Sequence, residues 1–144
     1  MACHDAAVRL LAAPLPRKEI PAYREGRYRL ADEVWGLDSV GMVVPQDRGR
    51  ILVIGSHAAL LGGRPESALP VDAAFAVFND AGGAVTRLPV LDARGIPAAA
   101  VGCMSARIGD CRSMWDMGVI SHANAKAGFV RRGMSVQEAV AAMR

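Results

Sequence analysis

A chain of 144 residues that is 52% hydrophobic and 22% charged has a globular composition, which excludes a disordered chain and predicts one core. The formal net charge of +3 comes without a basic stripe and does not favour nucleic acid as a partner. No apolar run reaches the roughly 18 residues of a membrane helix, and no signal-peptide pattern opens the chain. The three cysteines lack C-x-x-C spacing. We therefore expect a cytoplasmic bacterial protein with reduced thiols.

Residues 1–33 are rich in proline and arginine, and we expect them to form an N-terminal arm at a subunit interface of a homo-oligomer. Within this arm, the segment YREGRYRL carries arginines between two tyrosines. A solvated surface segment is one interpretation of it, and contact with RNA or phosphate is the alternative. Residues 34–144 are expected to form a single α/β domain.

The first elements expected in this domain are three strands. Residues 39–44, SVGMVV, are short and β-branched, and Pro45 and the residues after it close them like a turn. Residues 50–56, RILVIGS, form a continuous apolar run, which suits a strand buried on both faces. A second apolar run, residues 72–80, stops abruptly on polar residues and predicts another buried strand.

A helix, a further strand and a closing helix follow. The segment GGAVTRLPVLDARG predicts a helix that ends with Gly95 as its C-cap, provided that Pro89 lies in the first turn. Residues 96–103, IPAAAVGC, predict another buried strand, and Ser135 with Glu138 forms the capping-box pattern of a last helix. Alternation of buried runs with helices predicts a three-layer α/β domain with a mostly parallel sheet flanked by helices.

Polar residues and glycines gather where each buried run ends. The carboxyl ends of parallel strands share one edge of a sheet, and ligands bind in the crevice outside that edge. We therefore expect three segments that are distant in sequence to form one site: Gly55-Ser56-His57, Asn79 to Gly83, and Cys103 to Asp110.

His57 and Asp80 are the first candidates for proton transfer. A histidine titrates near neutral pH, and the glycines around His57 permit close approach of a ligand, although its ring could instead cap a loop. Ser56 is not expected to be the nucleophile of His57, because adjacent strand residues point to opposite faces. Asp80 could orient His57, carry a second proton or hold a metal, or it could simply cap a turn or helix.

The stretch SARIGD offers an anion-binding pair. Arg107 could clamp a carboxylate or phosphate, and Ser105 could donate to the same anion. Asp110 could balance Arg107 in an internal ion pair or join the acid-base set. Cys103 could act as a nucleophile beside His57, or be a small core residue, which is the more common role for a thiol that ends an apolar strand.

His122 lies two residues before Asn124, a spacing at which both could contact a ligand only from a loop or a strand. Metal-binding motifs are absent, so no cofactor is predicted, and a divalent metal is possible but unsupported. The predicted catalytic residues are His57, Asp80 and Asp110, and the predicted substrate-binding residues are Ser56, Asn79, Ser105, Arg107 and His122.

The motifs GSH, FNDAG, GIPAAAV, SARIGD and GVISHANA, taken in this order over roughly residues 36–142, resemble those of an uncharacterised family of small bacterial α/β proteins. In that family the first motif is expected to read Gly-Ser-His-Gly-Gly, whereas Ala58 and Ala59 stand here in place of the two glycines. The resemblance implies a shared site and a narrower or altered pocket in this chain, but no activity.

Two functional hypotheses fit these patterns. The first is a small cofactor-independent enzyme, a hydrolase, lyase or isomerase, that uses acid-base chemistry on a small anionic metabolite. The second is a non-catalytic ligand-binding or regulatory subunit that uses the same crevice as a sensor.

Overall fold

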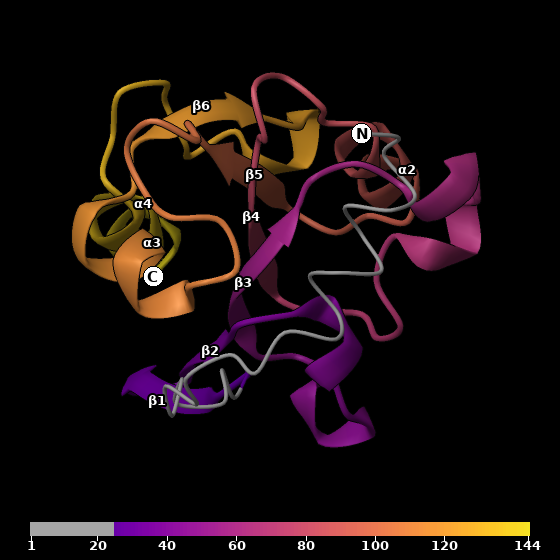
Figure 1. Ribbon diagram of the computed structural model, residues 1–144, viewed down its shortest axis with the longest axis horizontal. Coiled ribbons are helices and arrows are strands. Elements are labelled where there is room, and N and C mark those ends of the chain that lie inside the picture. The colour runs from indigo at the N-terminus through magenta and orange to yellow at the C-terminus, as the bar shows by residue number, and fades with distance from the viewer. Residues whose placement is uncertain (1–24) are drawn as a thin grey trace, which may run out of the picture.

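The computed structural model describes residues 25–144, and six strands of this part form one sheet in the order β1-β2-β3-β4-β5-β6. Three short α-helices and several 3₁₀ turns connect or follow these strands (Figure 1). The strands are β1 (Arg27–Ala31), β2 (Val34–Leu37), β3 (Ile51–His57), β4 (Phe75–Asn79), β5 (Ala98–Val101) and β6 (Ile120–Ala123). The α-helices are α2 (Arg87–Ala93), α3 (Cys111–Met117) and α4 (Val136–Met143).

The predicted mostly parallel three-layer α/β domain is wrong, because the sheet is mixed. Strands β2 to β5 pair in parallel, whereas both outer strands pair antiparallel with their neighbours. Only two residues, Asp32 and Glu33, separate β1 from β2, and so short a connection can form only an antiparallel hairpin. Strand β6 begins opposite Val101, where β5 ends, so the chain re-enters the sheet from the edge that it has just left.

The order of the strands decides which face each connection covers. Strands β2 to β5 are added one after another in a single direction, and right-handed crossovers then place all three connections on the same face. The 3₁₀ turns after β2 and β3 and helix α2 do pack together there. Helices α3 and α4 cover the opposite face, so α2 lies across the sheet from them (Figure 1).

The central strands alternate their side chains between two apolar clusters. On β3, Val53 points into the cluster under α3 and α4, and Ile54 points into the cluster under α2. On β4, Val77 points into the cluster under α3 and α4, and Phe78 points into the cluster under α2. Because both faces are covered, these strands are apolar from Ile51 to Gly55 and from Phe75 to Phe78, as the continuous runs in the sequence predicted.

Most of the elements predicted within the domain are confirmed. The runs at 72–80 and 96–103 contain β4 and β5, the run at 50–56 covers all of β3 except His57, and both predicted helices are present as α2 and α4. The strand predicted at 39–44 is wrong, because its centre forms a 3₁₀ turn at Val40–Met42 whose cap is Ser39.

The predicted N-terminal arm falls partly outside the described residues. Residues 1–24 lie there, and so does the predicted contact of the arm with another subunit. The end of the predicted arm, Arg27–Ala31, forms the edge strand β1. Between residues 25 and 144, no helix is long and apolar enough to cross a membrane.

Gly55 allows the start of α3 to approach β3 closely. Its carbonyl accepts a 2.8 Å hydrogen bond from the Gly109 amide. A Cβ atom at residue 55 would lie 2.5 Å from the Asp38 carbonyl oxygen and 2.9 Å from the Asp110 amide nitrogen. The glycine before Ser56 is therefore required for packing between the sheet and the loop that leads to α3.

We expect Gly55→Ala to lower the free energy of unfolding by about 2–4 kcal/mol, because the added methyl group meets backbone atoms that cannot move separately. Urea unfolding followed by circular dichroism measures the loss. Gly128→Ala is the matched control, since a Cβ there meets nothing closer than 3.7 Å, and it should change stability by less than about 1 kcal/mol. Equal effects of the two substitutions would contradict the steric explanation.

Candidate functional site

The connections diverge at the carboxyl ends of β4 and β5. The chain leaves β4 toward α2 on one face of the sheet and leaves β5 toward α3 on the other. Such a divergence opens space outside the strand ends, and ligands of open α/β sheets bind there. Asp80 directly follows β4 at this place, and the Asp80 amide donates a 2.8 Å hydrogen bond to the Val101 carbonyl at the end of β5.

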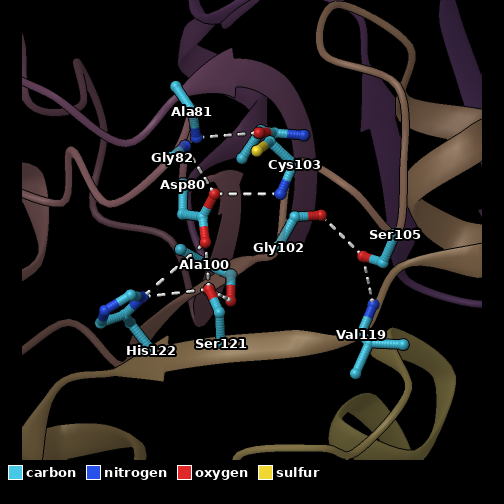
Figure 2. Close-up of polar contacts among 11 residues, drawn as sticks. Asp80, Ala81, Gly82, Ala100, Gly102, Cys103, Ser105, Val119, Ser121 and His122 are labelled. Carbon is cyan, nitrogen blue, oxygen red and sulfur yellow. Dashed lines mark hydrogen bonds and ion pairs between the residues drawn. The ribbon is translucent and has the colours of Figure 1, made fainter.

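The Asp80 carboxylate joins the segments that meet at this edge. Its Oδ1 accepts 2.9 Å hydrogen bonds from the amides of Gly82 and Cys103, and its Oδ2 accepts a 2.8 Å bond from the hydroxyl of Ser121 on β6 (Figure 2). Asp80 is only 7% exposed. A carboxylate buried to this degree needs such donors, because burial of an unpaired charge is costly.

The turn after Asp80 explains the sequence DAGG. Residues 81–83 all have positive φ values, which for Gly82 is +87° and for Ala81 is +48°. Glycine adopts this left-handed conformation without strain, whereas Ala81 adopts it against its preference. The turn directs the Gly82 amide to the Asp80 carboxylate and the Gly83 amide to the Asp80 carbonyl.

These contacts keep Asp80 ionised. Burial by itself raises the pKa of the Asp80 carboxyl. The hydrogen bonds from Gly82, Ser121 and Cys103 oppose burial and together bring the pKa below its usual value. The site therefore holds a fixed negative charge throughout the neutral pH range.

Ser121 links this charge to His122. The Ser121 Oγ lies 3.0 Å from His122 Nδ1, and His122 Nδ1 lies 4.0 Å from Asp80 Oδ2. A hydroxyl has one hydrogen to donate, and the ionised carboxylate is its strongest acceptor here. Ser121 can then only accept from His122, which assigns the proton of the neutral ring to Nδ1 and leaves a lone pair on Nε2.

The His122 ring is placed so that the lone pair on Nε2 is available. Figure 2 shows the second ring nitrogen of His122 pointing away from Asp80 and Ser121. The His122 side chain is 45% exposed. It lines a groove of about 530 Å³ between α2 and β6, together with Val85, Leu88, Pro89, Asp92 and residues 123–125. The chain Asp80–Ser121–His122 can therefore orient an imidazole base toward this groove.

Four of the predicted site residues use their polar atoms inside the protein. Ser56 Oγ accepts from the Val40 amide, Asn79 donates to the Ala106 carbonyl, Ser105 donates to the Gly102 carbonyl, and Asp110 caps α3 by accepting from the Ser113 amide. Ser105 Oγ also accepts from the Val119 amide. Each of these bonds fixes a loop next to the sheet edge.

The side chains of His57 and Arg107 are not part of the hydrogen-bonded chain Asp80–Ser121–His122. Within residues 25–144, no hydrogen bond joins the His57 side chain to Asp80, and the Nδ1 atom of His57 is buried without a partner. The Arg107 side chain is exposed and has no hydrogen-bond or ion-pair partner in this part of the chain. Arg107, Ser105 and Met117 line a separate hollow of about 350 Å³.

Both cysteines that fall in residues 25–144 are free, but their surroundings differ. Cys103 is exposed in the hollow beside Arg107, so its interpretation as a core residue is wrong. Cys111 is the first residue of α3 and is buried, and burial raises the pKa of its thiol to about 12.

Sequence patterns missed Ser121 and Arg87. Ser121 lies beside His122 in GVISHANA, but nothing in that motif indicates that the serine contacts Asp80 from a neighbouring strand. Arg87 is fully buried, and its guanidinium donates to the carbonyls of His57, Ser67 and Ala68. It thereby fixes the end of β3 to the loop after it, and burial lowers its pKa.

Asn124 is a structural residue next to the groove. Its side-chain oxygen accepts from the Ala98 amide, and its nitrogen donates to the carbonyls of Leu88 and Ile96. These bonds hold α2 against β6 and so form the groove. No group of three or more His, Cys, Asp or Glu residues between positions 25 and 144 could hold a metal ion.

Comparison of the chain with protein-family models, with curated proteins and with solved structures finds no match. The family resemblance stays a prediction.

We expect Asp80→Asn to lower the free energy of unfolding at neutral pH by about 2–3 kcal/mol, because a neutral amide accepts hydrogen bonds more weakly than the ionised carboxylate and keeps only one acceptor oxygen for its three donors. The folded-state pKa of Asp80 lies below the unfolded value of about 4, so its stabilisation is present above that pH and is lost as the pH falls through the folded-state pKa. Urea unfolding at several pH values should show that the variant loses less unfolding free energy than the parent protein as the pH is lowered.

Asp116→Asn is the control for Asp80→Asn. Asp116 is exposed, and its carboxylate has no partner among residues 25–144. This substitution should leave both the neutral stability and the acid loss within about 0.5 kcal/mol of the parent protein. If Asp80→Asn lost as much unfolding free energy at low pH as the parent protein, the role of the buried carboxylate would be contradicted.

Proposed function

We propose that the protein is a small enzyme that moves a proton on a small-molecule substrate, with His122 as the general acid or base. The observation that carries this proposal is the chain of hydrogen bonds from Asp80 through Ser121 to His122 Nδ1, beside a groove large enough for a metabolite. Asp80 and Ser121 are positioning residues that orient the imidazole.

The arrangement distinguishes between reaction classes. Ser121 and Asp80 both lie on the Nδ1 side of the ring. In a catalytic triad the carboxylate contacts Nδ1, whereas the nucleophilic serine contacts the other ring nitrogen, Nε2. Ser121 is therefore not proposed as a nucleophile. Proton abstraction from carbon, as in lyases and isomerases, or activation of water, as in hydrolases, fits the free Nε2.

The proposal moves the acid-base role from His57 to His122. His57 Nδ1 is buried without a partner in the described chain, while His122 has a carboxylate-linked partner and an exposed ring. Binding of a small anionic metabolite would rely on Arg107, whose hollow is distinct from the groove. A cytoplasmic location and assembly into a homo-oligomer remain part of the proposal.

The tautomer of His122 tests the orientation on which the proposal depends. In long-range ¹H–¹⁵N NMR spectra recorded at about pH 9, we expect the signals of the neutral ring to show the proton on Nδ1. Ser121→Ala should shift the population toward the Nε2–H form, which unconstrained histidines prefer. An Nε2–H ring in the parent protein would contradict the assigned chain of hydrogen bonds.

Activity gives the second test. In a screen of small esters, amides and carbon acids, any turnover found should fall about 100-fold or more in His122→Gln, as expected for loss of a general base. His57→Gln is the matched control and should retain most of the turnover. A ligand that binds in the groove without turnover, and with equal affinity in His122→Gln, would support a non-catalytic binding protein instead.

A further inference from the structure

The groove beside His122 runs along β6, from the carboxyl end of the neighbouring strand β5 toward the start of β5. His122 pairs with Ala100 near the carboxyl end of β5, and the Asn124 amide bonds to Ala98, where β5 begins. Two residues later, the Lys126 amide donates a 2.9 Å hydrogen bond to Asp92 Oδ1 on α2. His122 and Asp92 therefore occupy opposite ends of the groove.

The surface between these ends is apolar. Val85, Leu88 and Pro89 line the α2 side, and Ala123 and Ala125 line the β6 side. Asn124 is the polar residue between Ala123 and Ala125, and its side-chain NH₂ group is already hydrogen-bonded within the protein. A ligand that lies along the groove thus contacts hydrocarbon in its middle part.

Asp92 provides the charge at the far end. Its Oδ1 is held by the Lys126 amide, and the carboxylate forms no ion pair with a lysine or arginine in residues 25–144. No lysine or arginine is among the residues that line the groove. A carboxylate beside an apolar surface, without a cation of its own, attracts ammonium groups and repels carboxylates.

We propose that the groove binds an amine, with the ammonium group at Asp92, an apolar segment over Leu88 and Ala123, and the reacting group at His122. This inference rests on the proposed function only for the role of the end at His122. It replaces the anionic metabolite predicted from the sequence with a cationic ligand.

The length of the ligand follows from the backbone. An extended chain advances about 3.3 Å per residue, so the groove from His122 past Asn124 is at least roughly 7 Å long. A linear chain of six carbons with a terminal nitrogen covers this span.

Three matched probes test the inference: hexylamine, hexanol and hexanoate. They share the apolar chain and differ in the charge of the head group. In ¹H–¹⁵N NMR titrations of the full chain, we expect all shift changes from hexylamine to centre on Val85, Leu88 and Ala123. Hexylamine should bind about threefold to tenfold more tightly than hexanol, and hexanoate more weakly than hexanol, as expected for a partly exposed carboxylate.

Asp92→Asn identifies the group responsible. The asparagine keeps an oxygen to accept the Lys126 amide, so the groove is retained. Hexylamine should then bind only as tightly as hexanol, while the affinity for hexanol stays unchanged. Asp116→Asn, which removes an exposed carboxylate outside the groove, should leave every affinity unchanged.

The outcomes separate this inference from the proposed function. Equal affinities for hexylamine and hexanol, tighter binding of hexanoate, or no effect of Asp92→Asn would each overturn amine binding, whatever the tautomer of His122. Selective binding of hexylamine that also persists in His122→Gln would support the inference even if the enzyme proposal fails.

Discussion

A buried carboxylate at the end of β4 organises this protein. Asp80 is 7% exposed, and its charge has to be stabilised by donors that come from three separate segments. The Gly82 amide comes from the turn after β4, the Cys103 amide from the loop after β5, and the Ser121 hydroxyl from β6. Because removal of any one donor leaves part of a buried charge unsatisfied, the carboxylate fixes the relative positions of all three segments.

The same carboxylate orients the side chains of the candidate site. Ser121 donates to Asp80 and can then only accept from His122, so one hydrogen bond decides the orientation of the next. The imidazole directs its second nitrogen away from this chain (Figure 2). The groove forms beside it because Asn124 bonds to α2 and to the start of β5, which holds the helix against the edge of the sheet.

The sequence indicated where the site lies better than how it is built. Polar residues after the apolar runs correctly placed Asp80 at the end of β4, because a strand buried on both faces must be apolar until it leaves the core. His57 was one of the partners considered for Asp80, yet Asp80 Oδ2 accepts from Ser121 and lies 4.0 Å from His122 Nδ1. The antiparallel entry of β6 brings these two residues to the edge, and no local pattern in GVISHANA specifies that direction.

Local rules determined the parts of the fold that depend on neighbouring residues. The runs of β3, β4 and β5, the capping box of α4 at Ser135 and the end of α2 before Gly95 follow from burial and backbone preferences within about ten residues. Only the tertiary structure decided the direction of β6, the burial of Arg87 and the contact of Ser121 with Asp80. Each depends on which segments meet in space, and that is set by the packing of the whole chain, since the favourable burial of one segment depends on the position of all the others.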